Sequence, residues 1–215
     1  MSEDASFEDG EEKALNIGAF DKSDLEIISS LLQDSILPAS EIQWLPNSDK
    51  LVLPGVGAFG SCIQKLKSID GLKEALDEAV LKKAKPILGI CIGLQLMATS
   101  SFEGGKHNGL NWIEGDVIPL DPSDAKLKVP HMGWNNIVVK KNHPVFQDIK
   151  FSDYYFVHSY KFSPLDSKTI ISSTNYGEDF VSSLGRDNIL GTQFHPEKSQ
   201  AAGVTLLKNF IEWSP

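Results

Sequence analysis

Apolar residues in the first half of the chain follow two alternating patterns. Short apolar runs at 14–20, 41–45 and 50–53 predict β-strands, whereas apolar positions at helical spacing predict helices over 22–33 and 62–83. A strand–helix–strand–helix order is typical of parallel strands that are joined by right-handed crossovers. The pattern therefore predicts a doubly wound, flavodoxin-like α/β fold, with helices on both faces of a mixed sheet.

The second half of the chain changes to short apolar and β-branched runs, which are separated by turns rich in Gly, Pro, Asn and Asp. This spacing predicts antiparallel strands that are added to the parallel sheet. A closing amphipathic helix is predicted over 201–213. Because there is no internal repeat and no low-complexity linker, residues 14–215 are expected to form one domain. The predicted strands lie at 112–120, 135–140, 154–160, 169–174, 181–184 and 188–194.

The chain is acidic, with a formal net charge of −9, which argues against nucleic acid as the main partner. Acidic side chains crowd residues 1–13, so this stretch is predicted to be a disordered leader. It has neither the apolar centre of a signal peptide nor the composition of a transit peptide. The two cysteines form no CxxC pair, and no apolar run nears the roughly 18 residues that cross a membrane. The sequence therefore predicts a soluble, cytoplasmic protein without a disulfide framework.

The stretch 85–97 carries the strongest candidate for chemistry. An apolar run behind Pro86 changes into a helical pattern, and Cys91 lies at the junction, two residues after Gly89 and two before Gly93. This is the layout of a nucleophile elbow, in which a strand turns sharply into a helix and presents one side chain above the sheet edge. The free amides and dipole of a helix N-terminus favour a thiolate. Taken alone, the pattern also fits a cysteine that is buried as a small apolar residue.

A second candidate lies at the end of the last predicted strand, where His195 and Glu197 stand two residues apart. On an extended backbone these side chains point the same way, so the carboxylate can orient the imidazole and stabilise its protonated form. A strand-end histidine alone is equally well explained by solvation or by a structural hydrogen bond. Together with Cys91 at an elbow, however, the pair predicts a nucleophilic Cys–His–Glu triad.

Two loops have interpretations that the residues alone leave open. Loop 54–60 carries three glycines after a buried strand; we expect it to supply backbone amides to an oxyanion, and the alternative is an ordinary tight turn. The turn 129–135, which contains Trp134, fits either a protein–protein contact or a buried anchor. No metal and no cofactor are predicted, because no second ligand stands at a suitable spacing and no phosphate-binding motif is present. His107 and His143 lie in polar turns and are not expected to be catalytic.

Five segments together resemble the glutaminase subunits of imidazole glycerol phosphate synthase, which are class I, triad-type glutamine amidotransferases. The resemblance extends from about residue 50 to the C-terminus. The elbow and the His-Pro-Glu segment are typical of the whole class, whereas the PGVGAFG loop at 54–60 and the PHMGWN turn point to this subunit. The segments are PGVGAFG at 54–60, GICIGLQL at 89–96, PHMGWN at 130–135, VHSY at 157–160 and QFHPEKS at 193–199.

The resemblance implies a role for each matching residue. Cys91 would attack the side-chain amide of glutamine, His195 would carry the thiol proton to the leaving ammonia, and Glu197 would orient His195. The backbone amides of Val56 and Ile92 would hold the oxyanion of the intermediate. The other implied residues are Gly57, Gln95, Ser159 and Tyr160 for glutamine binding, and Trp134, Tyr155 and Lys198 for the partner interface or the ammonia passage.

The same resemblance implies that ammonia passes to a HisF-like (β/α)8 cyclase subunit, in a heterodimer that serves histidine biosynthesis. Members of the family usually open with a DYGxGN-like turn on the partner-facing side. The corresponding stretch 17–24 lacks the Tyr, the second Gly and the Asn, which bears on the identity of the partner. Three alternatives stay open: a paralogue that supplies ammonia for sugar amidation, a stand-alone γ-glutamyl hydrolase-like cysteine hydrolase, and a non-catalytic binding module on this fold.

Overall fold

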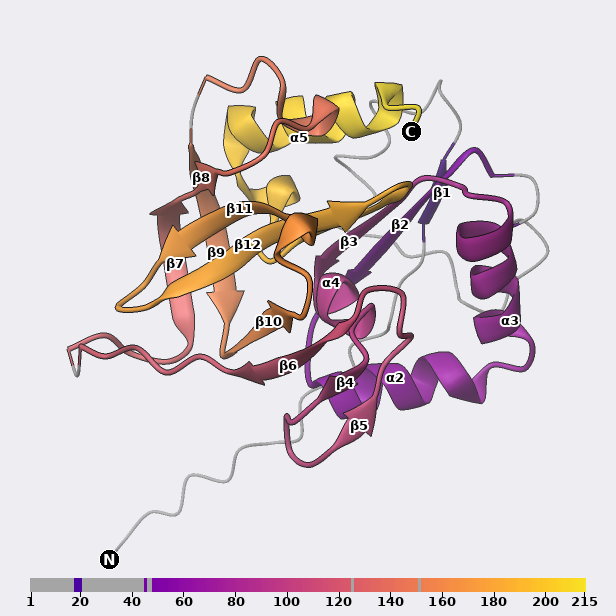
Figure 1. The fold of residues 1–215 in the computed structure, drawn as a ribbon, viewed down its shortest axis with the longest axis horizontal. Helices are drawn as coiled ribbons and strands as arrows, with labels where there is room; N and C mark the ends of the chain where they lie inside the picture. Colours follow the sequence, from indigo (N-terminus) through magenta and orange to yellow (C-terminus); the bar gives the residue numbers. More distant parts are fainter. Residues whose placement is uncertain (1–17, 21–44, 46–47, 125, 151) are drawn as a thin grey trace, which may run out of the picture.

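The computed structural model describes residues 18–20, 45, 48–124, 126–150 and 152–215. In this part of the chain, a main sheet of seven strands lies beside two smaller sheets (Figure 1). The main sheet has the order β1 (Gly18–Phe20), β2 (Lys50–Gly55), β3 (Ile87–Cys91), β13 (Ile189–Thr192), β12 (Asp179–Arg186), β11 (Ile170–Asn175) and β8 (Val138–Val139). The smaller sheets are β10 (Tyr160–Pro164), β6 (Gly115–Pro119), β4 (Ser100–Ser101) and β5 (His107–Asn108), and the pair β7 (His131–Asn136) and β9 (Asp153–His158).

The centre of the main sheet is parallel, as the sequence predicts. β3 pairs in parallel with β2 on one side and with β13 on the other, so that Gly55 lies opposite Cys91 and Thr192 lies opposite Ile90. The carboxyl ends of these three strands therefore meet at one edge, which is where open α/β sheets bind their ligands. β12, β11 and β8 continue the sheet in antiparallel pairs, which confirms the predicted additions.

The first strand runs against the prediction. β1 pairs antiparallel with β2, with Ala19 opposite Leu51, whereas the strand–helix order predicted a parallel strand. β1 has one neighbour at the edge of the sheet, and mixed sheets often carry an antiparallel edge strand. Of the predicted strands 14–20 and 41–45, only 18–20 and Leu45 are described; the predicted leader 1–13 and helix 22–33 lie outside the described residues.

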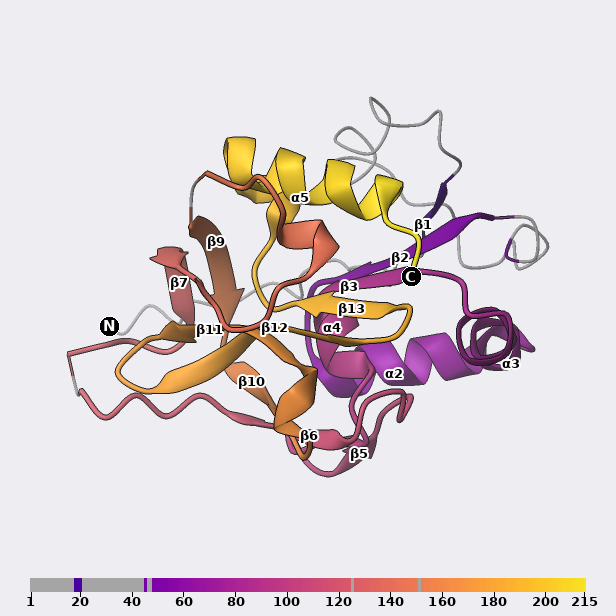
Figure 2. The same cartoon turned by 45° about the horizontal axis from the view of Figure 1, so that its top comes forward.

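Helices cover both faces of the main sheet (Figure 1 and Figure 2). α2 (Phe59–Ser68) and α3 (Leu72–Asp77) lie on one face, α5 (Gln200–Glu212) lies on the other, and α4 (Ile92–Leu96) follows β3 directly. The continuous helix predicted over 62–83 is wrong, because Gly71, with a φ of 72°, separates α2 from α3. Short helical segments complete the fold: a π-helical one at Glu78–Lys82 and 3-10 turns at Pro144–Phe146, Ser167–Thr169 and Pro196–Lys198.

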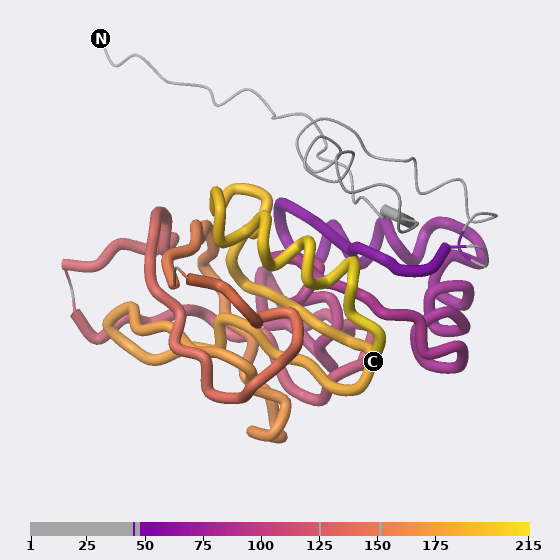
Figure 3. The backbone as a smooth tube through the Cα atoms, turned by 90° about the horizontal axis from the view of Figure 1, so that it is seen from above, coloured from indigo at the N-terminus to yellow at the C-terminus, as the bar shows by residue number. Residues whose placement is uncertain are grey.

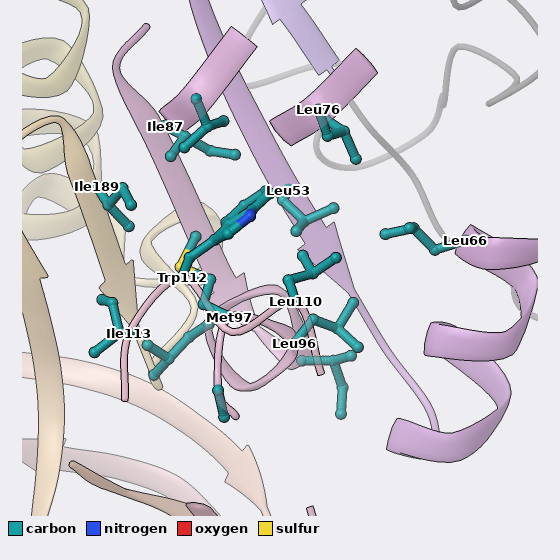
Figure 4. Packing of buried hydrophobic residues seen from close by; sticks show 14 of the residues in the cluster. Leu53, Leu66, Leu76, Ile87, Leu96, Met97, Leu110, Trp112, Ile113 and Ile189 are labelled. Atoms are coloured by element: carbon teal, nitrogen blue, oxygen red, sulfur yellow. The ribbon is translucent and has the colours of Figure 1, made fainter. Parts of the chain in front are cut away.

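Two apolar cores lie on the two faces of the sheet. Along β2, Leu51 and Leu53 belong to the core beside α2 and α3, whereas Val52 belongs to the core beside α5, which is the period of two expected for a strand buried on both faces. Trp112 lies in the middle of the first core (Figure 4), and its indole N–H donates to Asp77 Oδ1 at 2.8 Å. Figure 3 shows the second face from above, with α5 in front of the strands.

The strands predicted for the second half are present with shifted ends, except that the run 135–140 is divided between β7 and β8, which belong to different sheets. The run 112–120 is a strand only from Gly115, because Trp112 and Ile113 turn into the core. The run 154–160 is divided at Ser159, where the chain leaves the β7–β9 pair and enters the sheet of β10. The two-residue strands β4 and β5 were not predicted, because they are too short to show a period. Among the described residues, no helix has the length and apolar character needed to span a membrane.

Candidate active site

Cys91 is the last residue of β3 and the N-cap of α4, where the elbow pattern places it. Its φ of 53° and ψ of −108° lie outside the regions that non-glycine residues favour. Such strain persists only where the surrounding packing enforces it, and it concentrates at functional positions. The side chain is 5% exposed, yet it lines a pocket at the carboxyl edge of the parallel strands, so it is more than a core residue.

The two flanking glycines make this turn sterically possible. A Cβ atom on Gly93 would lie 1.6 Å from the carbonyl oxygen of Leu53 in β2. A Cβ atom on Gly89 would lie 2.8 Å from the backbone of Gly93 and 2.7 Å from the end of Met97. A side chain at either position would push α4 away from the sheet. Because α4 has only five residues, the free amides of its first turn, rather than a long helix dipole, act on Cys91.

His195 reaches the pocket from the segment that follows β13. Its backbone amide donates to the carbonyl of Tyr155 at 2.9 Å, and its carbonyl accepts from Ser199 Oγ at 2.6 Å. The same Ser199 hydroxyl accepts from the amide of Tyr155 at 3.0 Å. These bonds tie the main chain of His195 to β9, which limits how far the imidazole can move relative to Cys91.

The imidazole of His195 and the carboxylate of Glu197 form the predicted pair. Nδ1 of His195 lies 2.6 Å from Glu197 Oε1, and the turn Pro196–Lys198 brings the two side chains together. Because an ionised carboxylate only accepts hydrogen bonds, Nδ1 carries a proton and donates it. Nε2 of the ring has no hydrogen bond within the described residues, but it interacts electrostatically with Cys91.

The surroundings of His195 favour its protonated form. Burial acts to lower the pKa of the ring because it disfavours the charged form, but the interactions with Cys91 and Glu197 outweigh burial and raise the pKa to about 9. Near pH 7 both ring nitrogens therefore hold a proton. An imidazolium beside a cysteine stabilises the thiolate and keeps a proton ready for a leaving group.

The pocket around Cys91 has a volume of about 410 Å³. It brings together most of the residues that the sequence assigned to the site, whereas Glu197, Trp134 and Tyr155 lie outside its lining. A concave site with a few convergent polar groups suits a small polar ligand. The predicted residues in its lining are Val56, Gly57, Cys91, Ile92, Gln95, Ser159, Tyr160, His195 and Lys198.

The loop after β2 packs directly on the elbow. A Cβ atom on Gly55 would lie 3.3 Å from Ile92 Cβ, so the two main chains are close. Val56 is 40% exposed, and Gly57 has a φ of 109°, which L side chains rarely adopt. The carbonyl of Val56 accepts from the thiol of Cys62 at 3.7 Å, which links the loop to α2. The loop predicted to hold an oxyanion therefore lies in the wall of the pocket.

Gln95 and Gln193 form a polar network that reaches the nucleophile. Gln95 Nε2 donates to the carbonyl of Tyr160 and to Gln193 Oε1, both at 3.0 Å. Gln193 Nε2 in turn lies 3.8 Å from Cys91 Sγ, and the carbonyl of Val157 lies 3.8 Å from the same sulfur. Sequence reasoning assigned Gln95 but missed Gln193, whose one signal is a polar side chain at the end of a buried strand.

Glu103 is a second residue that sequence reasoning missed. It follows β4 and lines the pocket, and its Oε2 accepts from the backbone amide of Phe59, at the start of α2, at 2.8 Å. Among the described residues that line the pocket, Glu103 is the one with an acidic side chain. Such a charge suits a ligand that carries an amino group. No local motif marks Glu103, because long-range folding alone brings it to the pocket.

Two of the three residues assigned to a partner interface, Trp134 and Tyr155, lie next to each other. Trp134 of β7 lies opposite Tyr155 of β9, and their ring centroids are 6.2 Å apart in an edge-on arrangement. Trp134 is 49% exposed and the nearby Met132 is 62% exposed. Exposed Trp and Met side chains are enriched in protein–protein interfaces. Lys198, the third residue of this group, lies in the lining of the Cys91 pocket.

The sequence matches known proteins over most of its length. Residues 26–213 match the family Glutamine amidotransferase class-I. The imidazole glycerol phosphate synthase subunit HisH of Brucella suis biovar 1 (strain 1330) is 48% identical over 179 residues, which cover 81% of this chain and 83% of that relative. The HisH subunit of Zymomonas mobilis subsp. mobilis is 45% identical over 190 residues, which cover 88% of each chain.

Solved structures share the fold at lower sequence identity. A crystal structure of a glutamine amidotransferase matches with a TM-score of 0.61 and 15% identity, covering 90% of this chain and 94% of the other. The glutaminase domain of Trypanosoma brucei CTPS matches with a TM-score of 0.56 and 14% identity, covering 90% and 87%. From these matches, the chain belongs to the class-I glutamine amidotransferase family and, within it, to the HisH subunits of imidazole glycerol phosphate synthase.

Proposed function

We propose that this chain is the glutaminase subunit of an imidazole glycerol phosphate synthase. It hydrolyses glutamine to glutamate and ammonia in the cytoplasm, and it passes the ammonia to a HisF-like (β/α)8 cyclase subunit in histidine biosynthesis. One observation carries the proposal: Cys91, on a strained elbow, lines the same pocket as His195, whose ring is paired with Glu197. The identity of 45–48% to HisH subunits over about four fifths of the chain supports the same activity.

In the first half of the reaction, the sulfur of Cys91 attacks the side-chain carbonyl carbon of glutamine. The carbonyl oxygen becomes negatively charged, and the amides of Val56 and Ile92, which belong to the pocket wall, stabilise that charge. His195 then gives its Nε2 proton to the amide nitrogen, which leaves as ammonia while the carbon–nitrogen bond breaks. A thioester between Cys91 and the glutamyl group remains.

In the second half, water attacks the thioester and His195 takes up a proton from that water. The carbon–sulfur bond breaks, glutamate leaves, and the thiolate of Cys91 and the protonated ring of His195 are restored. Glu197 is assigned no contact with substrate or sulfur; it holds Nδ1 of His195 at 2.6 Å and stabilises the positive charge that the ring carries before it protonates the departing ammonia and after it takes a proton from water. The Cys91, His195 and Glu197 side chains thus act as one unit.

Glutamine binding is assigned to groups in the lining of the pocket. Gly57, Gln95, Ser159 and Tyr160 line the pocket, and Gln95 is already oriented by its two hydrogen bonds. Glu103 lies in the same lining and suits the α-ammonium group of the substrate.

The Glu103→Gln variant is expected to raise KM for glutamine by about tenfold or more while kcat changes less. The variant keeps an oxygen that accepts from the Phe59 amide, but it loses the charge that attracts an ammonium group in both the ground state and the transition state. Steady-state kinetics with glutamine as the varied substrate give both constants. The matched control is Glu114→Gln, at an exposed position outside the pocket, which should leave KM unchanged. An unaltered KM in Glu103→Gln would place the ammonium group elsewhere.

The partner is assigned to the surface of Trp134 and Tyr155. Trp134 is exposed and packs edge-on against Tyr155, whose backbone carbonyl accepts from the amide of His195 in the pocket lining, so a partner bound there would lie near the catalytic segment. We expect a HisF-like (β/α)8 cyclase subunit at this position; the relatives are themselves named as a subunit of imidazole glycerol phosphate synthase, which supports the presence of a partner subunit.

The experiment that tests the function compares glutaminase activity with and without the co-expressed cyclase subunit. An amidotransferase subunit should show a sharp rise in glutamate release when the cyclase is present. Activity that does not depend on the partner would identify a stand-alone γ-glutamyl hydrolase-like enzyme, and no activity in either case would identify a non-catalytic module. Identification of the cyclase-like chain that co-purifies separates histidine biosynthesis from ammonia supply for sugar amidation.

A further inference from the structure

A chain of hydrogen-bonded side chains connects β7 with the wall of the glutamine pocket. Asn135 Nδ2 lies 3.2 Å from His131 Nε2, and His131 Nδ1 lies 3.0 Å from His158 Nε2. His158 Nδ1 then lies 2.9 Å from the carbonyl oxygen of Tyr160. His131 and His158 are 2% and 6% exposed, so water does not compete freely for these groups. The catalytic steps described above use neither histidine.

The carbonyl of Tyr160, where the row of hydrogen bonds ends, sets the donor and the acceptor of every hydrogen bond in it. A carbonyl oxygen only accepts, so Nδ1 of His158 must donate to it, and in a neutral ring Nε2 of His158 must then accept. Nδ1 of His131 is therefore the donor to His158. It follows that Nε2 of His131 accepts, and that the group facing it must be the NH₂ of Asn135.

The other contacts of Asn135 fix its orientation independently and give the same answer. Its Nδ2 also donates to the carbonyl of Asn175 at 3.0 Å, which only a nitrogen can do. Its Oδ1 accepts from the backbone amide of Asn136 at 2.8 Å. The contacts of Asn135 and the carbonyl of Tyr160, at the two ends of this row of hydrogen bonds, therefore require the same single arrangement, with a proton on Nδ1 of both His131 and His158.

The packing around the two rings keeps them neutral. Burial lowers the pKa of His131 to about 4, and burial together with the neighbouring His131 and His195 lowers the pKa of His158 to about 3, although its bond to Tyr160 opposes the shift. The ring of His131 stacks on Tyr176, with centroids 4.0 Å apart, and on Phe156, with centroids 4.8 Å apart. Each ring therefore has one donor and one acceptor near pH 7, as the chain of bonds requires.

The carbonyl at the end of the chain also orients a residue of the substrate pocket. The oxygen of Tyr160 accepts from Gln95 Nε2 as well as from His158. Gln95 uses its second amide proton on Gln193 Oε1. Because both protons of the Gln95 amide are used, its oxygen is the atom left to accept a hydrogen bond from a ligand. The position of the Tyr160 carbonyl thus decides which face Gln95 presents to the pocket.

We propose that Asn135, His131 and His158 are positioning residues for glutamine binding, which hold the Tyr160 carbonyl and, through it, the amide of Gln95. The inference rests on the proposed function, in which this pocket binds glutamine. Asn135 and His131 lie outside the pocket lining and act through His158, Tyr160 and Gln95, whereas His158 also lines the pocket; the proposed mechanism assigns proton transfer to none of the three. Loss of these side-chain hydrogen bonds therefore weakens glutamine binding in the ground state and in the transition state alike, which raises KM more than it lowers kcat.

The His131→Phe variant tests this role because it keeps an aromatic ring against Tyr176 and Phe156 but removes both nitrogens. In the complex with the cyclase subunit, we expect KM for glutamine to rise by about tenfold, with kcat within about threefold of the wild type. The control is Tyr176→Phe, which keeps the stack on His131 and removes the hydrogen bond of its hydroxyl to the Lys128 carbonyl, outside the chain. It should leave KM unchanged. An equal rise in KM in both variants would overturn the proposal in favour of general destabilisation.

A measurement on the wild-type protein tests the directions of these hydrogen bonds without any assay of activity. In ¹⁵N NMR spectra of ¹⁵N-histidine-labelled protein at pH 7, His131 and His158 should both be neutral with the proton on Nδ1. A proton on Nε2 of either ring would overturn the proposed direction, even if His131→Phe failed to fold. Because these spectra do not depend on turnover, an inactive wild-type complex would refute the glutaminase function and leave the hydrogen-bond chain as a separate result.

Discussion

Replacing Cys91 with alanine is expected to lower glutaminase turnover by about 10³-fold or more, while the chain still folds and binds the proposed cyclase partner. In the proposed mechanism the sulfur forms the thioester, and no other thiol lines the pocket. The substitution removes one heavy atom at a pocket wall, so little packing is lost. Residual activity would come from the oxyanion loop and from substrate binding. Glutamate release at saturating glutamine, measured in the purified complex, gives the ratio of the two kcat values.

Cys62→Ala is the matched control for this experiment, because Cys62 is the other cysteine of the chain. Burial, aided by the nearby charges of Glu103 and Cys91, raises the pKa of Cys62 to about 11, so its thiol is a poor nucleophile. We expect Cys62→Ala to keep turnover within about tenfold of the wild type. Wild-type turnover in Cys91→Ala would mean that the nucleophile is a different residue, and it would remove the basis for the proposed mechanism.

The elbow was predictable because its chemistry and its sterics act within a few residues. The change from an apolar run to a helical period, with glycines on both sides of Cys91, is visible in the sequence. The structure supplies the reason for one glycine: the carbonyl of Leu53 leaves no space for a Cβ atom on Gly93. The pairing of His195 with Glu197 was equally local, but the extended backbone assumed for it is wrong, because the 3-10 turn Pro196–Lys198 brings the two side chains together.

Features that depend on distant segments had no comparable signal. The antiparallel direction of β1 follows from pairing at a sheet edge, which the order of elements does not reveal. Glu103 lines the pocket and Gln193 approaches Cys91 only through the long-range folding of the segments that follow β4 and β13. The bond between His131 and His158 joins residues 27 positions apart in sequence, on two paired strands. In the sequence each of these side chains is simply a polar residue beside a strand.

The Glu197→Gln variant is expected to lower kcat by about 10²- to 10⁴-fold. Glutamine has the same shape and keeps an oxygen toward Nδ1 of His195, but it lacks the negative charge. Because the carboxylate favours the protonated ring, its removal lowers the pKa of His195 from the wild-type value of about 9. The ring is then less often protonated near pH 7, so Cys91 loses its positive neighbour and the departing ammonia loses its proton donor.

The pH dependence of the reaction distinguishes this loss of charge from a loss of structure. In the wild type, kcat should fall as the pH rises through about 9, where His195 loses its proton, and in Glu197→Gln this alkaline limb should move to lower pH. The free energy of unfolding should also fall as the pH rises. The raised pKa of His195 contributes fully to the stability of the fold below the ordinary histidine pKa of 6.5, and this contribution is lost as the pH rises through about 9. Glu212→Gln, at an exposed position near the end of α5, is the control and should leave the limb in place. An alkaline limb at the wild-type pH in Glu197→Gln would show that Glu197 does not set the protonation of His195, and Glu197 would then have to be removed from the catalytic unit.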